Sequence, residues 1–157
     1  MTSVRTGLGV DTHRFAEGRR LVLGGVEIPH DRGLAGHSDA DVLTHAIADA
    51  VLGAAGLGDI GEHFPDTDPA WRNADSIELL RAVIERARAA GWAVAHVDAT
   101  VVLERPRLAP HRAEIAARLA VVVGSVNFKA TTGEGMGFVG REEGVAALAV
   151  ATLERRS

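Results

Sequence analysis

The sequence predicts an α+β fold in which a mixed β-sheet carries helices packed on one face. Two observations lead to this prediction. Segments with strand patterns are separated by single helical segments, which is typical of an α+β or α/β sandwich with one helical layer. The chain has 157 residues, of which 46% are hydrophobic and 24% are charged, and this size and composition fit a single domain over residues 1–157.

The first third of the chain should contain two strands and one helix. Residues 3–10 and 20–28 have strand patterns, and the apolar run of the second ends at a Gly-Gly pair. A helix should open at Ser38, because Asp41 follows three residues later as in a relative of the capping box, and it should stop near Gly56.

The middle of the chain begins with a segment that has neither pattern. Residues 57–73 include two prolines and two glycines, and they are expected to form a long loop, which is uncommon unless the loop is functional. A helix over about 75–90 and a strand over 93–103 should follow, because their apolar residues recur at helical and then at alternating spacing.

The last third should contain a helix, a strand and a final helix. Pro110 suits the first turn of the earlier helix, and apolar residues alternate from 126 to 130 as in a strand. A Gly-rich loop over 133–140 then leads to the final helix. That helix is expected to carry the apolar residues Val145, Leu148 and Leu153.

The composition excludes several classes of protein. The formal net charge is −4, which argues against a nucleic-acid partner. No apolar run approaches the roughly 20 residues that span a bilayer, and the first residues lack the apolar stretch of a signal peptide, so we expect a cytoplasmic protein without a membrane partner. The chain has no cysteine, so any metal must be held by His, Asp and Glu.

Asp11 and His13 are the first candidate metal ligands, because positions i and i+2 of a strand point to the same face. On the first helix, Asp41, His45 and Asp49 form a polar stripe at i, i+4 and i+8. Two histidines and one carboxylate would leave an open coordination position, as in catalytic zinc sites. A strand-end Asp with a solvated His, and a solvated helix face with ordinary ion pairs, are the alternatives.

Two further clusters could hold phosphate. His37 and Ser38 lie where the first helix should begin, and free N–H groups there favour an anion, although Ser38 could equally be a plain cap. Thr131 and Thr132 precede the Gly-rich loop, in which Glu134 could bind a hard cation such as Mg²⁺. The alternative for this second cluster is an ordinary strand-to-helix turn.

Four motifs, in order and at family-like spacing, make the chain resemble the 2-C-methyl-D-erythritol 2,4-cyclodiphosphate synthase family nearly from end to end. They are GVDTHRF at 9–15, GHSDAD at 36–41, LGDIG at 57–61 followed by FPDTD at 64–68, and KATTGE at 129–134. Each motif is modest alone, whereas the ordered set is highly specific.

The resemblance implies a reaction, an assembly and a pathway. The reaction converts 4-diphosphocytidyl-2-C-methyl-D-erythritol 2-phosphate to the cyclic diphosphate and releases CMP, which makes the enzyme a phosphorus–oxygen lyase of non-mevalonate isoprenoid (MEP) biosynthesis. The assembly is a homotrimer with its sheets toward the threefold axis and three active sites between neighbouring subunits.

The resemblance also implies site residues. Asp11, His13 and His45 would hold zinc, and Glu134 would hold a second divalent cation, Mg²⁺ or Mn²⁺, on the diphosphate. His37 and Thr132 correspond to positions that stabilise the transition state. The residues expected to contact substrate are Asp11, His13, His37, Ser38, Asp59, Ile60, Gly61, Phe64, Pro65, Asp66, Thr67, Asp68, Leu103, Pro106, Arg107, Leu108, Ala109, Thr131, Thr132, Gly133, Glu134, Phe138 and Arg141.

The sequence departs from the family pattern at five positions. Ala40 replaces a frequent Gly, which should be tolerated if the backbone is helical there. Gly133 stands for a Thr or Ser, and Gly135 for a Lys. Arg107 and Ala109 stand for a Lys and a larger apolar residue in the 103–109 segment, which, with Thr131, the resemblance implies forms the cytidine end of the site. Backbone contacts to the base should survive these changes.

Two other functions remain open on the residues alone. A zinc-dependent phosphohydrolase would use the same two histidines and carboxylate to activate water on a phosphate ester. A non-catalytic trimer that binds nucleotides or isoprenoid diphosphates is the second, although an intact Asp11, His13, His45 and Glu134 set favours an enzyme.

Overall fold

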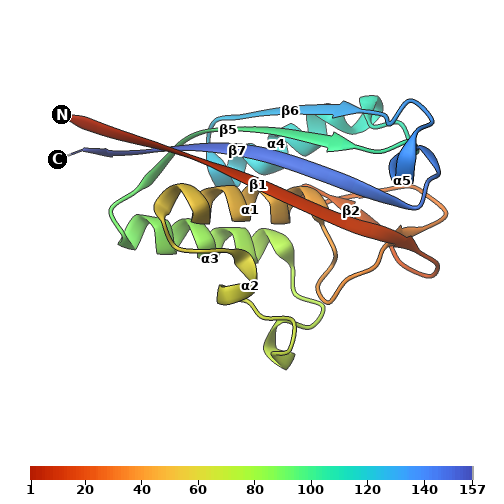
Figure 1. Cartoon of the computed structure of the whole chain (residues 1–157), viewed down its shortest axis with the longest axis horizontal. Helices are drawn as coiled ribbons and strands as arrows, with labels where there is room; N and C mark the ends of the chain where they lie inside the picture. The colour runs from red at the N-terminus through yellow and green to blue at the C-terminus, as the bar shows by residue number, and fades with distance from the viewer. Residues whose placement is uncertain (157) are drawn as a thin grey trace.

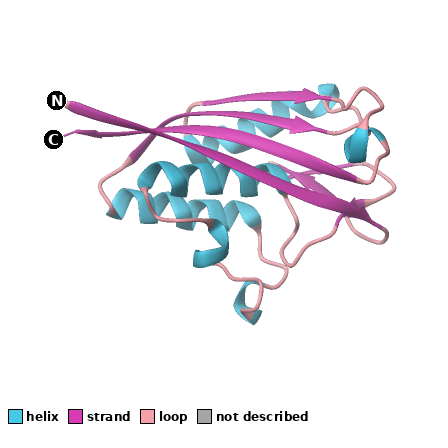
Figure 2. Ribbon diagram, in the orientation of Figure 1, coloured by secondary structure: helices cyan, strands magenta, loops and turns pink. Residues whose placement is uncertain are grey.

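The computed structural model describes residues 1–156 and has an α+β fold, as the sequence predicts. A five-stranded mixed sheet has the order β4-β1-β7-β5-β6, in which only the β5–β6 pair is parallel. The helices lie on one side of this sheet (Figures 1 and 2). The sheet strands are β1 (Thr2–Ala16), β4 (Gly33–Leu34), β5 (Ala93–Val102), β6 (Val126–Thr131) and β7 (Gly144–Arg156).

Three long helices and several short elements complete the fold. The long helices are α1 (Val42–Ala55), α3 (Ser76–Ala89) and α4 (Arg112–Val123), and α1 lies between the sheet and α3 (Figure 1). The short elements are the hairpin β2 (Leu21–Leu23) and β3 (Val26–Ile28), the helices α2 (Ile60–His63) and α5 (Gly137–Gly140), and the 3₁₀ turns Pro69–Trp71 and Ala109–His111. Within these residues, no helix is both long and apolar enough to cross a membrane.

Small residues bring α1 close to the centre of the sheet. Gly7 and Gly9 of β1 face the helix, and a Cβ added to Gly9 would lie 1.8 Å from the carbonyl oxygen of Ala46. On the neighbouring strand, Ala147, Ala149 and Ala151 are buried in the same layer. This close approach places the α1 backbone directly beside the strand that carries Asp11 and His13.

The predicted final helix is wrong, because residues 144–156 form strand β7. Its buried residues recur at every second position, namely Val145, Ala147, Ala149, Ala151 and Leu153, whereas Leu148 is exposed. β7 pairs with β1 from Gly144↔Arg14 to Arg156↔Thr2. Alanine has a high helix propensity, but pairing on both edges and burial of one face outweigh it here.

The predicted start of the first helix is also wrong. Helix α1 begins at Val42, and its N-cap is Asp41, whose side chain accepts from Thr44 N–H at 3.0 Å; Ser38 lies in the preceding loop. The buried Asp41 carboxylate also accepts from the N–H groups of Gly24 and Gly25, at 2.9 and 2.7 Å. Burial raises the pKa of Asp41, although the hydrogen bonds from Thr44 and the two glycines oppose that shift.

Several other local predictions also differ from the structure. Ala40 adopts φ +56° rather than a helical angle, so the expectation that a helical backbone accommodates it is wrong. Residues 20–28 form a hairpin turning at the Gly pair rather than one strand, and the loop over 57–73 includes α2 and a 3₁₀ turn. The first strand continues to Ala16, six residues past its predicted end, and neither β4 nor α5 was predicted. The other elements agree with prediction to within a few residues.

The sheet face opposite the helices carries an apolar patch. We call it the open-face patch and define it as Val4, Leu8, Val10, Leu148 and Val150, all of them exposed. The register places Leu8 beside Val150 and Val10 beside Leu148, so four of these side chains are contiguous across β1 and β7. Contiguous exposed apolar patches are typical of interaction sites.

Candidate functional site

Strand β1 and helix α1 bring together two histidines and one aspartate. Asp11 and His13 point to the same side of β1, toward α1, which carries His45. The Asp11 Oδ2 atom lies 2.8 Å from His13 Nε2 and 3.3 Å from His45 Nδ1. One ligand atom from each of the three side chains lies within 4.8 Å of the others. Within residues 1–156, no other group of three such side chains could hold a metal ion.

The second nitrogen of each histidine is held by a hydrogen bond. His13 Nδ1 donates to the Ala35 carbonyl oxygen at 2.7 Å. His45 Nε2 lies 2.7 Å from Ser76 Oγ and 3.1 Å from Ser38 Oγ. These contacts leave His13 Nε2 and His45 Nδ1 facing Asp11. Two imidazole nitrogens and one carboxylate are the donor set of a possible metal site consistent with zinc.

The predicted polar stripe on α1 is only partly correct. His45 does face the cluster, but Asp41 is fully buried as the helix cap and turns toward the β2–β3 hairpin. Asp49 accepts a hydrogen bond from Ile60 N–H at 2.8 Å and so ties α2 to α1. Serines therefore contact the second nitrogen of His45, and neither aspartate of the stripe does.

Contacts within the cluster shift the pKa values of Asp11 and His13. Burial raises the pKa of Asp11, but hydrogen bonds from His13 and His45 outweigh this and bring it to about 2. Burial lowers the pKa of His13, but its hydrogen bond and charge interaction with Asp11 outweigh this and raise it. An ionised carboxylate thus faces two imidazole nitrogens, an arrangement in which a cation can take the place of protons.

A cavity of about 450 Å³ opens over the cluster. It is lined by ten residues that the sequence had nominated: Asp11, His13, His37, Ser38, His45, Ile60, Gly61, Phe64, Pro65 and Asp66. Sequence reasoning missed Val10, Gly36, Trp71 and Leu79, and it noted Asp49 only for its place on the helix. The packing of Trp71 edge-on to Phe64, with ring centroids 4.7 Å apart, could not be read from local spacing.

Three nominated residues of the 57–73 segment do not line this cavity. The Asp59 and Asp68 side chains cap α2 and the following 3₁₀ turn, and Thr67 is not among the lining residues. His37 Nε2 lies 3.3 Å from the Asp68 carbonyl oxygen, and this contact links the 57–73 segment to the loop before α1. Because that loop precedes α1, His37 and Ser38 do not occupy the helix N-terminus that the sequence predicted.

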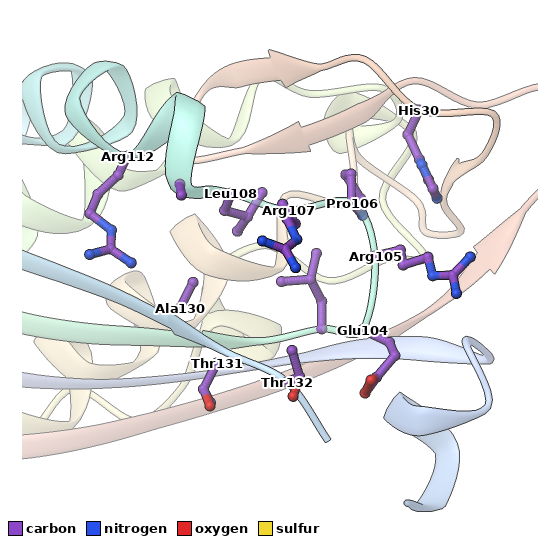
Figure 3. A pocket seen from close by; sticks show the side chains of 12 residues that line it. His30, Glu104, Arg105, Pro106, Arg107, Leu108, Arg112, Ala130, Thr131 and Thr132 are labelled. Carbon is purple, nitrogen blue, oxygen red and sulfur yellow. The ribbon is translucent and has the colours of Figure 1, made fainter. Parts of the chain in front are cut away.

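A second cavity of about 710 Å³ lies at the far end of β5 and β6. It is lined by the nominated residues Leu103, Pro106, Arg107, Leu108, Ala109, Thr131 and Thr132, and by His30, Glu104, Arg105, Arg112 and Ala130, which were not among the predicted contact residues. Figure 3 shows the side chains of Arg107, in the loop after β5, and of Arg112, at the start of α4, extending toward the strand that carries Ala130. With Arg105, three arginines and one glutamate line the cavity, and the resulting positive charge suits an anionic ligand.

Glu134 stands apart from both the cluster and the second cavity. Its side chain is exposed, its backbone has φ +53°, and its N–H donates to Thr132 Oγ1 at 3.2 Å. Gly133 N–H donates to Glu104 Oε1 at 2.9 Å, which fixes the loop to the end of β5. Phe138 lines a small cavity beside His13, and Arg141 pairs with Glu143 at 3.4 Å.

The fold and the Asp-His-His cluster together define a small α+β protein with a candidate catalytic metal site. The model of the YgbB family matches residues 4–154. The chain therefore belongs to the YgbB family.

Relatives whose names state an activity are similar over nearly the whole chain. The chain is 63% identical over 155 residues to the 2-C-methyl-D-erythritol 2,4-cyclodiphosphate synthase of Salinibacter ruber, covering 96% of this chain and 99% of that protein. It is 62% identical to the bifunctional enzyme IspD/IspF of Anaeromyxobacter dehalogenans, covering 97% of this chain but 40% of that protein.

Solved structures share the fold. The bifunctional IspDF from Campylobacter jejuni matches with a TM-score of 0.95 at 42% identity, over 100% of this chain and 44% of that one. A CDP-bound 2C-methyl-D-erythritol-2,4-cyclodiphosphate synthase matches with a TM-score of 0.87 at 39% identity, over 95% of this chain and 99% of that one.

Proposed function

We propose that the chain is a 2-C-methyl-D-erythritol 2,4-cyclodiphosphate synthase, an enzyme that cyclises 4-diphosphocytidyl-2-C-methyl-D-erythritol 2-phosphate and releases CMP. The observation that carries this proposal is the Asp11, His13 and His45 cluster in a cavity of a chain 63% identical to the Salinibacter ruber synthase. Further relatives with the same activity are 59% and 58% identical over nearly the whole chain.

The chemistry suits a site without a protein nucleophile. An oxygen of the 2-phosphate attacks the β-phosphorus of the same molecule, the bond from that phosphorus to CMP breaks, and no water is consumed. The enzyme must fold a polyanion on itself and neutralise its charge, so catalysis rests on positioning and electrostatics. A zinc ion on Asp11, His13 and His45 would supply a Lewis acid for the phosphoryl oxygens.

The two cavities divide the substrate between them. The cavity over the cluster, which Gly61, Phe64 and Asp66 help to line, takes the methylerythritol diphosphate end. The Arg107 and Thr131 cavity takes the cytidine end. His37 and Thr132 stabilise the transition state, and Glu134 holds a second cation, Mg²⁺ or Mn²⁺, on the diphosphate. The departures at Gly133 and Ala109 leave backbone groups available for these contacts.

A homotrimer with its sheets toward the threefold axis explains the open-face patch. Leu8 and Val10 are 64% and 53% exposed in the isolated chain, which is unusual for contiguous apolar residues at the centre of a sheet. Active sites between neighbouring subunits would also join the cluster of one subunit to the Glu134 loop of the next.

Assembly can be measured by light scattering. We expect the wild-type chain to scatter as a trimer, and Leu8→Asp to give a folded monomer with little turnover, because a carboxylate would be buried at the interface. A wild-type monomer at micromolar concentration with full turnover would overturn the trimer.

Phosphorus NMR tests the activity itself. Purified protein is incubated with the diphosphocytidyl substrate, with and without a chelator. We expect CMP and a cyclic diphosphate, and loss of both with the chelator. An acyclic bisphosphate would instead identify a phosphohydrolase, and an unchanged substrate would identify a protein that only binds it.

A further inference from the structure

A buried serine holds the metal-distal nitrogen of His45. Ser76, the first residue of α3, is fully buried and its Oγ lies 2.7 Å from His45 Nε2. Ser38 Oγ lies farther away, at 3.1 Å, and also accepts from the N–H of Ala40 at 3.3 Å. Ser76 is thus the closer of the two partners, and it comes from a helix 31 residues away along the chain.

Asp39 decides which way the Ser76 hydroxyl points. The Ser76 Oγ–H donates to Asp39 Oδ1, and the Ser76 N–H donates to Asp39 Oδ2 at 3.0 Å. Asp39 Oδ1 also accepts from the N–H of Asp41 at 3.1 Å. A carboxylate can only accept hydrogen bonds, so the hydroxyl proton of Ser76 is committed to Asp39.

The direction of that proton sets the tautomer of His45. With its proton on Asp39, Ser76 Oγ can offer only lone pairs to the imidazole, so His45 Nε2 must carry a proton and donate. The lone pair then resides on Nδ1, the atom that faces Asp11. In metal sites, groups that orient a ligand histidine in this way typically contribute 10–100-fold to metal affinity.

We propose that Asp39 is a positioning residue that acts through Ser76 to fix the tautomer and ring orientation of His45 for metal binding. The proposal rests on the proposed function only in requiring a metal at the cluster. Asp39 belongs to the 36–41 motif and Ser76 to α3, so the chain of hydrogen bonds also couples the loop before α1 to a separate helix.

The zinc dissociation constant, measured by competition with a chromophoric chelator, tests the proposal. We expect Ser76→Ala and Asp39→Asn each to weaken zinc binding about 10–100-fold. In Asp39→Asn the new amide nitrogen must face either the Ser76 N–H or the Ser76 hydroxyl, so one donor loses its acceptor. Ser76→Thr keeps the hydroxyl and should bind zinc like wild type.

A matched control separates positioning from loosening of α3. Asp75 is the N-cap of α3, with its side chain accepting from Ile77 N–H at 2.9 Å, and no hydrogen bond joins it to His45. Asp75→Ala removes a cap beside Ser76, and we expect it to lower stability while leaving zinc affinity unchanged. Circular dichroism of every variant establishes that it is folded.

Histidine NMR gives a readout that a structural role would not move. In zinc-loaded protein with ¹⁵N-labelled histidine, we expect His45 Nε2–H to exchange slowly with water in wild type and in Ser76→Thr. The same proton should exchange fast in Ser76→Ala and Asp39→Asn.

Distinct outcomes overturn the two proposals. Equal weakening of zinc binding by Asp75→Ala and Ser76→Ala, wild-type affinity in both Asp39→Asn and Ser76→Ala, or no zinc binding by wild type overturns the positioning role. A wild type that binds zinc tightly and loses affinity as expected, yet forms no cyclic product, retains the positioning role and rejects the proposed activity.

Discussion

Two regions of the molecule carry candidate cation ligands, namely the Asp11, His13 and His45 cluster and the segment from β6 to Glu134. The ligands are held in place by hydrogen bonds in the first region but not in the second. In the cluster, three side chains converge from β1 and α1, and hydrogen bonds to Ala35 and Ser76 fix both rings. In the other region, Glu134 is exposed and no hydrogen bond or ion pair within residues 1–156 reaches its carboxylate. The ligands of the cluster are therefore oriented within a single chain, whereas the Glu134 carboxylate has no such contacts within residues 1–156.

The difference indicates how each cation should bind. A cluster whose ligands are already oriented loses little freedom on binding, so zinc should remain in the substrate-free protein. A lone exposed carboxylate suits a hard cation that keeps several waters and shares its shell with substrate phosphates. The second cation should therefore bind well only together with the diphosphate.

Removing a cluster ligand should have the largest effect. His45→Ala is expected to leave a folded protein with little bound zinc, and to lower turnover by about 10³-fold, since a Lewis-acid cation contributes several kcal/mol to transition-state stabilisation. Elemental analysis after dialysis measures the zinc. A wild-type zinc content in this variant would remove His45 from the site.

Forcing β1 away from α1 should break the cluster without touching its ligands. Gly9→Ala places a Cβ against the Ala46 carbonyl, and overpacking of this kind costs about 3 kcal/mol. We expect lower thermal stability together with weaker zinc binding. Gly53→Ala, on the α1 helix that Gly9 faces, is the matched control. Nothing lies within 4 Å of the added Cβ, so this change should stabilise the protein by up to about 1 kcal/mol and leave zinc binding unchanged.

Glu134→Gln tests the segment from β6 to Glu134. The change removes the charge and keeps the shape, and we expect turnover to fall about 10²-fold, as for loss of one electrostatic group at a reacting centre. Steady-state assays at rising Mg²⁺ or Mn²⁺ should show partial recovery, with zinc content unchanged. Loss of zinc would assign Glu134 to the first site, and full turnover at low Mg²⁺ would make it an ordinary loop residue.

The smallest effect is expected on β6, which leads into that loop. Lys129 Nζ lies 2.8 Å from Asp98 Oδ2, and hydrogen bonds from Lys129 and Asn127 lower the pKa of Asp98 below 3.8. This stabilisation is present above pH 3.8 and is lost as the pH falls through the lower folded-state pKa. Because the pair is exposed, Lys129→Gln should cost less than about 1 kcal/mol at neutral pH.

Urea titrations of wild type and Lys129→Gln, at neutral pH and again at a pH below the folded-state pKa of Asp98, measure that effect. The difference between the two proteins should shrink under acid. A difference that grows under acid would contradict the assignment of the pair.

Several features of the site follow from local patterns in the sequence. Strand alternation places Asp11 and His13 on one face, and this is where the structure has them. The helical spacing that puts His45 on α1 is also local. The four motifs bring in the loop that lines the cavity, including Phe64 and Asp66. Each of these inferences uses a period or a short motif, which the chain encodes within a few residues.

Tertiary structure decided what local patterns left ambiguous. Residues 144–156 alternate small buried residues with exposed ones, but alanine also favours helices, and only pairing with β1 and β5 makes them a strand. Asp41 looked like a member of a polar stripe until the Gly24–Gly25 turn, distant in sequence, claimed its carboxylate. Long-range register and burial leave little trace in a local window.

By itself, the sequence determined the fold class, the family resemblance and the identity of the three cluster residues. Only the tertiary structure showed that Ser76, itself bonded to Asp39, contacts His45. It also showed that the candidate site residues line two separate cavities and that an apolar patch lies on the open face of the sheet. The physical reason is that a hydrogen bond between side chains 31 residues apart, or a face left without a covering layer, depends on how elements pack rather than on the pattern within any one of them.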